Sequence, residues 1–194
     1  NFFYIPSKIF VKENAALTVA NILNNEMLFR FGIVSNLIGQ ILFIFLVLVL
    51  YQLFKDVDKL YARLMVALVV AAVPVAFIII LNQIACLVVL SGADFLKVFD
   101  TDQLQALSFL FYNLYNDGII IIGIFWGLWL YPFGYLVIKS GFIPKILGFL
   151  LILGCFAFLV DSFSFLLIPK YHDDISNLIT LPMSIGEVSM IFWL

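Results

Sequence analysis

The segment FDTDQLQALSFLFYNLYNDGIIIIGIFWGLWLYPFGYLVI, from Phe99 to Ile138, decides the fold because it joins a polar stretch to a long apolar one. Asn113, Asn116 and Asp117 lie where the two parts meet. A charged side chain near the centre of a bilayer costs about 2.5–3.5 kcal/mol on insertion scales, so an acid that enters a span normally has a partner or a water-filled cavity. Asp117 is therefore the first candidate functional residue.

The composition of the whole chain indicates an integral membrane protein. Of its 194 residues, 65% are hydrophobic and 11% are charged, and the mean hydropathy is +1.19. Charged residues make up about a quarter of a typical soluble domain. The net charge of -2 gives no reason to expect nucleic acid as a partner. The chain begins with Asn1 and not with methionine, and we expect further sequence before it.

Five apolar segments are long enough to cross a hydrocarbon core of about 30 Å as helices. We predict these spans at about 31–54, 64–90, 118–138, 146–168 and 175–194. Residues 1–6 resemble the end of a further span. Residues 13–29 have the polar and apolar spacing of an amphipathic helix on the outer surface. The sequence thus predicts an all-α fold, a single polytopic transmembrane helical bundle over residues 1–194.

The connections between the spans predict two local features. Asp100 or Thr101 is placed to cap a helix that begins near Asp102. The segment Pro169–Asp174, PKYHDD, is predicted as a loop. It holds the chain's only histidine beside two aspartates, but a zinc site needs further ligands. We therefore predict neither a metal nor a cofactor.

Small residues within the spans are interpreted as packing elements. Cys86 and Cys155 fall inside apolar segments, where a free cysteine is typical of a small buried hydrophobic residue. Gly123 and Gly127 are separated by three residues, a spacing that lets two helices approach closely. We expect this pair to serve packing within the chain and not a dimer face.

Basic residues in the short loops predict the orientation in the membrane. The loops 55–63 and 139–145 hold most of the lysine and arginine, whereas the loops on the other side hold only Lys97 and Lys170. Because cytoplasmic loops carry the excess of basic residues, we place the first two loops in the cytoplasm.

Polar side chains gather in the outer halves of the predicted spans. At about 1.5 Å per residue, Asp161 lies about 10 Å and Glu187 about 18 Å below the outer surface, and Asp117 lies within about 15 Å of it. The inner halves are nearly free of polar residues. This asymmetry predicts a polar cavity that opens outward. The candidate ligand-binding residues are Asp117, Asp161, Glu187, Arg30, Asn36, Gln40, Asn82, Gln83 and Asn113.

The three acids need a counter-charge, and no lysine or arginine lies inside a predicted span. Arg30, at the mouth of the first span, is the expected partner because its side chain can reach inward while its head stays wet. An ordinary anchor at the membrane interface is an equally good interpretation of Arg30. The amides also have a structural interpretation, since polar side chains hydrogen-bond between helices at about 0.6 kcal/mol each.

Three classes of function stay open from the residues. The first is binding or transport of a small amphiphilic or cationic ligand in the outward cavity. The second is an intramembrane enzyme in which paired carboxylates act as acid and base. The third is a structural subunit of a membrane complex. The sequence carries no hydrolase, protease, nucleotide or redox signature. Membrane lipids and the ligand are the expected partners.

Several short motifs along nearly the whole chain resemble one family. They are Phe29-Arg30, Ser35-Asn36, Leu50-Tyr51, SGAD at Ser91–Asp94, FDTDQLQALSFLF at Phe99–Phe111, SGFIPKILG at Ser140–Gly148, Asp161-Ser162-Phe163 and Ile185-Gly186-Glu187. Together they resemble the bacterial integral membrane family known as domain of unknown function 4386. The resemblance implies a multi-span protein of the bacterial inner membrane with one more N-terminal span, and it supplies no catalytic residue.

Overall fold

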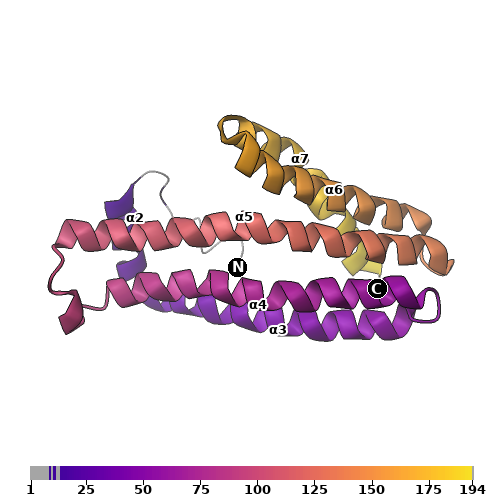
Figure 1. Cartoon of the computed structure of the whole chain (residues 1–194), viewed down its shortest axis with the longest axis horizontal. Coiled ribbons are helices and arrows are strands. Elements are labelled where there is room, and N and C mark those ends of the chain that lie inside the picture. Colours follow the sequence, from indigo (N-terminus) through magenta and orange to yellow (C-terminus); the bar gives the residue numbers. More distant parts are fainter. Residues whose placement is uncertain (1–8, 10, 12–13, 194) are drawn as a thin grey trace. The chain divides into compact units, whose positions relative to one another are not determined.

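The computed structural model describes residues 9, 11 and 14–193, except for the side chains at 181–184, 186–187 and 191–193. The described residues form helices and contain no strand (Figure 1). This confirms the all-α class. The elements are α2 (Ala15–Asn24), α3 (Glu26–Phe54), α4 (Lys59–Val89), the 3-10 helix η1 (Asp94–Leu96), α5 (Thr101–Ser140), α6 (Lys145–Leu167) and α7 (Pro169–Trp193).

The chain forms two compact units. Unit 1 consists of Asn1–Ile41 and Ala76–Ile119, and unit 2 consists of Leu42–Val75 and Ile120–Leu194. Helices α3, α4 and α5 each contribute one part to each unit, whereas α6 and α7 belong to unit 2 alone. Each unit is therefore described separately below.

Four helices in the described part of the chain, α3 to α6, are long and apolar enough to cross a membrane. The protein is thus a multi-pass membrane protein by helix length and composition. Helix α5 is continuous over 40 residues, or about 60 Å, so the polar stretch and the predicted third span form one helix. Residues 175–193 of the predicted fifth span lie within α7. The number of spans stays a prediction.

Two aspartates fix the starts of long helices, as short polar side chains do at helix N-termini. Asp100 accepts a hydrogen bond from the backbone N–H of Gln103 at 2.8 Å, and the Gln103 side chain accepts from the Asp100 N–H at 3.0 Å. This reciprocal capping box confirms the predicted cap. Asp58 in turn accepts from the N–H groups of Leu60 and Tyr61 at the start of α4.

The predicted surface helix over residues 13–29 is wrong in its extent. Helix α2 ends at Asn24, and α3 begins two residues later at Glu26. The break has a local cause, because the Asn25 side chain donates to the Asn21 carbonyl at 3.0 Å. Asparagine side chains compete for backbone groups in this way and disfavour a helix interior. The predicted end of a further span at residues 1–6 lies outside the described residues.

The predicted loop over Pro169–Asp174 is also wrong, because these residues form the first turns of α7. Helix α6 ends at Leu167 and the chain reverses at Ile168. Proline fits the first position of a helix, where its missing N–H has no intrahelical partner to lose. The histidine of the PKYHDD segment therefore lies on a helix, and its position is set by that helix.

Glycines hold α5 and α6 in close contact within unit 2. A Cβ placed on Gly134 would lie 2.6 Å from the Gly148 carbonyl oxygen, and a Cβ on Gly148 would lie 2.6 Å from that of Gly134. A Cβ on Gly127 would lie 2.8 Å from the Phe158 Cβ. Only glycine lets the two backbones approach so closely. The predicted role of Gly123 and Gly127 in packing within the chain is confirmed.

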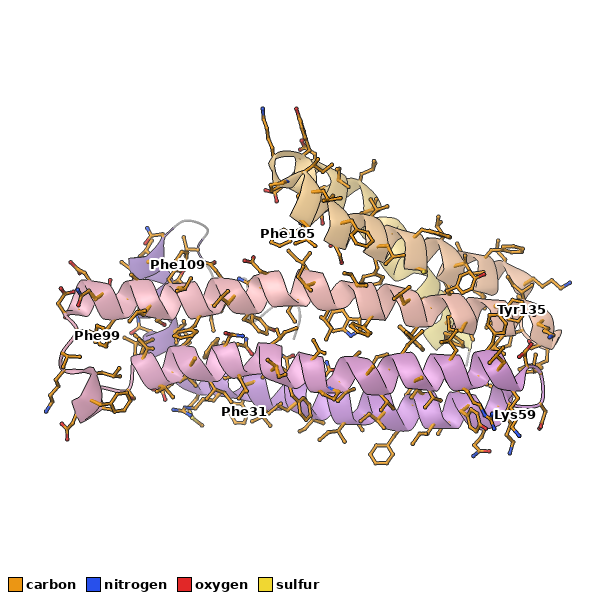
Figure 2. All side chains as sticks on the ribbon, viewed as in Figure 1. Phe31, Lys59, Phe99, Phe109, Tyr135 and Phe165 are labelled. Atoms are coloured by element: carbon orange, nitrogen blue, oxygen red, sulfur yellow. The ribbon has the colours of Figure 1, made fainter. Side chains whose placement is uncertain are left out.

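The two loops predicted to share one side of the membrane do lie at one end of unit 2. The Lys139 ammonium contacts the Asp58 carboxylate at 2.7 Å, and the rings of Tyr61 and Tyr135 stack with centroids 4.0 Å apart. Figure 2 shows Lys59 and Tyr135 at this end. That this end is cytoplasmic stays a prediction.

Candidate functional site

The predicted site residues divide between the two units. Unit 1 contains Arg30, Asn36, Gln40, Asn82, Gln83, Asn113 and Asp117, and unit 2 contains Asp161 and Glu187. The Glu187 side chain lies outside the described residues. Seven of these residues lie in one unit and two in the other, so the prediction that all nine side chains line one outward cavity stays a prediction.

The sequence predicts that Arg30 pairs with an acid inside a span. In the structure its partner is Glu26, an acid on the same helix. The Arg30 Nε lies 2.7 Å from Glu26 Oε1, one turn earlier on α3. Both side chains are about half exposed, at 53% for Arg30 and 46% for Glu26. Residues four apart on a helix are neighbours, which explains why the nearby acid is bound.

The sequence allows the amide side chains of unit 1 to serve as hydrogen bonds between helices, and one of them does so. Asn36 Nδ2 donates to the Tyr115 hydroxyl at 3.2 Å and so joins α3 to α5. Asn82 Nδ2 donates to the Ile79 carbonyl of its own helix at 3.1 Å. The buried Oε1 atoms of Gln40 and Gln83 accept no hydrogen bond from any residue that the structure describes.

Asp117 is exposed, whereas the sequence predicts an acid inside a polar cavity. The next residue, Gly118, faces α4, because a Cβ there would lie 2.8 Å from Ile79 Cγ2. Asn113, one turn before Asp117, is half-buried. Within unit 1, the residue of α5 that lies against α4 at this point is thus Gly118, whereas Asp117 is exposed.

A buried cluster in unit 2 was only partly predicted. Asp161 and Ser164 lie one turn apart on α6, and His172 faces them from α7. All three are buried, with exposed fractions of 9%, 5% and 9%. The sequence singles out Asp161 alone, because the histidine falls in a predicted loop. The signal that could have found the cluster is Pro169, which favours a helix start.

The hydrogen bonds of the cluster involve the Nδ1 atom of His172. Ser164 Oγ donates to the Asp161 carbonyl oxygen at 2.9 Å and lies 3.1 Å from His172 Nδ1. A hydroxyl has one hydrogen to donate. Where Ser164 gives it to the Asp161 backbone carbonyl, the second contact is made by the Nδ1–H tautomer of His172. The donor and acceptor roles in that contact follow from the tautomer.

The Asp161 carboxylate is incompletely satisfied. Its Oδ1 lies 3.9 Å from His172 Nδ1, which is close enough for an ion pair and too far for a hydrogen bond. Oδ1 accepts no hydrogen bond from the described residues. The other side of the imidazole is apolar: the Phe165 ring meets it edge-on, with centroids 5.3 Å apart (Phe165 is labelled in Figure 2). A buried acceptor without a donor is uncommon in native structures.

The three residue types of the cluster resemble a nucleophilic triad, but their geometry does not. A serine hydrolase relay needs the serine on one imidazole nitrogen and the aspartate on the other. Here Ser164 and Asp161 both approach Nδ1. Within the described part of the chain, no three His, Cys, Asp or Glu side chains are grouped as a metal ion would need. The arrangement suits binding of a charge or a proton.

An open groove of about 370 Å³ lies between α6 and α7 beside this cluster. It is lined by Phe156, Leu159, Val160, Phe163, Ser164, Leu167, Ile168 and Ile175. Ser164 is the one polar side chain in this lining, and it is also the residue that touches His172 and the Asp161 backbone. The groove thus combines a long apolar lining with one polar group, the Ser164 hydroxyl, which contacts the backbone of the buried Asp161.

The comparison with protein families matches the whole chain. The family model described as Domain of unknown function (DUF4386) covers residues 1–194. The chain belongs to this family. No curated protein and no solved structure matches it. Since the DUF4386 description names no activity, the function of this member has to be argued from its own residues.

Proposed function

We propose that this membrane protein binds a small amphiphile with a basic head group between α6 and α7. The observation that carries the proposal is the buried Asp161 carboxylate, whose Oδ1 has no donor among the described residues. Ionisable side chains within a membrane are expensive and face a partner or a ligand. A ligand that brings both a positive charge and an N–H group satisfies this acid.

The charge pattern of α6 favours a cationic head group. Asp161 is the only acid of this helix, and its one basic residue, Lys145, lies at the opposite end. The basic side chain that lies near Asp161 in the described structure is His172, and it makes no hydrogen bond to Oδ1. An ammonium next to Ser164 is attracted by the carboxylate behind it, because a low dielectric weakens charge interactions far less than water does.

The groove favours an apolar tail. Its lining on α6 runs from Phe156 to Leu167, a rise of about 17 Å along the helix. Each methylene that leaves water for such a surface contributes about 0.8 kcal/mol. Phe156, Val160 and Phe163 are exposed, so the groove is accessible to a molecule dissolved in the lipid. The basic head group of the proposed ligand is thus matched by Asp161 and its apolar tail by the groove lining, and both lie on α6.

Binding of radiolabelled dodecylamine to the protein in lipid nanodiscs tests the proposal. Dodecanol, with the same chain and no charge, measures partition into the lipid. We expect saturable amine binding that Asp161→Asn weakens by about tenfold or more, equivalent to about 1.4 kcal/mol. Asp58→Asn makes the same change at an acid that does not line the groove and should leave binding unchanged.

Two results contradict the proposal. One is equal amine binding by the wild type and by Asp161→Asn. The other is saturable binding of dodecanol as strong as that of dodecylamine, which shows that the groove holds any alkyl chain. The second comparison uses the wild type alone, so it decides the question even where a variant fails to fold.

A further inference from the structure

We infer that this site exchanges a proton for the basic head group, and that His172 carries the proton. The inference rests on the proposed function and adds to it a second ligand, the proton, with a named carrier. Its basis is the geometry of one carboxylate with one imidazole beside it, at 3.9 Å. Both side chains are about nine-tenths buried, at 12% and 11% exposed.

The hydrogen-bond pattern indicates which proton moves. In the proposed exchange the Ser164 hydroxyl donates to the Asp161 backbone carbonyl, and its Oγ accepts from His172 Nδ1, 3.1 Å away. Nδ1 keeps its hydrogen in both states, so the neutral ring is the Nδ1–H tautomer. The second proton, which makes the ring an imidazolium, binds at Nε2. That proton is the one that can leave while the contacts of the cluster stay in place.

The exchange balances in charge. In the proposed state without the ligand, His172 carries its second proton opposite the Asp161 carboxylate, 3.9 Å away, and the two charges balance. When an ammonium enters, two positive charges would share one buried carboxylate, which is unfavourable where water is excluded. His172 then releases its Nε2 proton to the solvent, and the ammonium becomes the counter-charge of Asp161. One cation enters and one proton leaves, and no other bond changes.

Other ionisable groups near His172 do not offer a competing partner on the packed side. On α7, Lys170, Asp173 and Asp174 are exposed, and the positions three or four residues from His172 are uncharged. On α6, Asp161 is the only charged residue after Lys145. In the part of α5 that belongs to unit 2, the titratable residues are Tyr131, Tyr135 and Lys139, and Lys139 pairs with Asp58.

The chain has one histidine, so labelling with ¹⁵N-histidine gives a single ring to observe in the intact protein. The protein in nanodiscs is titrated with acid, with and without dodecylamine, and the ring nitrogens report both tautomer and charge. At an amine concentration about tenfold above its Kd, we expect the titration midpoint of His172 to fall by about one pH unit. Dodecanol should not move it, and Asp161→Asn should remove the shift.

Each outcome decides a separate point. A midpoint that stays constant while labelled dodecylamine is shown to bind overturns the exchange and leaves the proposed function standing. No amine binding at any pH overturns both. A neutral ring in the Nε2–H tautomer contradicts the assignment of the moving proton and with it the exchange. A reciprocal loss of amine affinity at low pH supports it, since linkage acts equally on both ligands.

Discussion

Unit 2 contains two pairs of acid and base that differ in how fully the acid is satisfied. Asp58 accepts hydrogen bonds from Lys139 at 2.7 Å and from the N–H groups of Leu60 and Tyr61. Asp161 is more deeply buried, and its nearest base, His172, lies 3.9 Å away. The first acid caps α4 and joins it to the end of α5, and each of its two oxygens accepts a hydrogen bond. The second acid retains an acceptor that the described structure does not use.

The contrast teaches where to look for function in a protein of this kind. A carboxylate with its hydrogen-bond partners in place, such as Asp58, contributes to structure. A buried carboxylate without a donor, such as Asp161 in a helix long enough to span a membrane, is unfavourable for folding alone, and this is the basis of the binding site proposed above.

The largest effect is expected where α6, which carries Asp161, is held against α5. Gly134→Ala places a Cβ 2.6 Å from the Gly148 carbonyl oxygen and 2.8 Å from Ile152 Cγ1. Because a backbone atom cannot rotate away, we expect a loss of about 1–3 kcal/mol in the free energy of unfolding. Reversible unfolding in detergent mixtures measures it.

The matched control is Gly39→Ala, at a helical glycine with no atom within 4 Å of the added Cβ. Alanine is the better helix former by about 1 kcal/mol, so this variant should be as stable as the wild type or more so. Equal losses at both positions would show that the glycines do not hold α6 in place. The buried pair would then need another explanation for its position.

The second effect concerns the buried pair itself. His172→Leu removes the ring nitrogen that contacts Ser164 and the base that lies beside Asp161 among the described residues. Leaving buried polar groups unpaired costs about 1–3 kcal/mol each, so we expect a loss of that size in unfolding free energy. Tyr171→Leu changes the exposed neighbouring residue and should stay within about 0.5 kcal/mol. A loss no larger for His172→Leu than for this control would count against a structural link to Asp161.

The third effect is a pH dependence at the exposed pair. The hydrogen bond from Lys139, and then that from the Tyr61 N–H, lower the pKa of Asp58 below its usual value. A lowered pKa in the folded state means that the carboxylate stabilises the fold above the unfolded pKa, near 3.9. That contribution is lost as the pH falls through the lower, folded pKa.

We therefore expect Asp58→Asn to be less stable than the wild type at neutral pH and equally stable in acid. Thermal unfolding between about pH 7 and pH 2 measures the difference, the lower limit lying below the reference pKa of an aspartate. Asp56→Asn, at an exposed acid two residues away, is the control and should show no such convergence. A constant difference across the range would mean that the charge of Asp58 does not contribute.

The smallest effect is expected at Arg30. Its pair with Glu26 is about half exposed and lies within one helix, so Arg30→Ala should cost about 0.3–0.5 kcal/mol. The same unfolding assay measures this, and added salt should remove it. A loss above about 2 kcal/mol would indicate a buried partner and would support the acid within a span that the sequence predicts.

Much of the fold follows from local patterns. The apolar lengths predict the helices that can cross a membrane, and Asp100 predicts the start of α5, because a cap depends on residues within one turn. The Gly123 and Gly127 spacing predicts close packing within the chain. Two local predictions were wrong. The predicted surface helix breaks at Asn25, and the predicted loop after Ile168 is a helix that begins at Pro169. Asparagine occurs both inside helices and at their ends, and proline occurs both in loops and at helix starts, so the sequence alone did not decide either position.

The candidate site was harder to predict, because depth in the membrane gives no direction around a helix. The sequence predicts both Asp117 and Asp161 as acids in the outer half of a span, yet the first is exposed and the second is buried. The amide of Asn36 finds Tyr115, which is 79 residues away in the chain. Such partners depend on how the helices turn their faces toward one another.

The sequence by itself determined that this is a helical membrane protein, because hydrophobicity and length alone decide whether a helix can cross a bilayer. It also predicts a span over residues 146–168 that includes Asp161, and α6 is long and apolar enough to be one. Only the tertiary structure decided that Asp161, Ser164 and His172 come together, because the reversal of the chain at Ile168 lays α7 against α6. Contacts between faces of two helices depend on their rotation about their own axes, which packing fixes and composition does not.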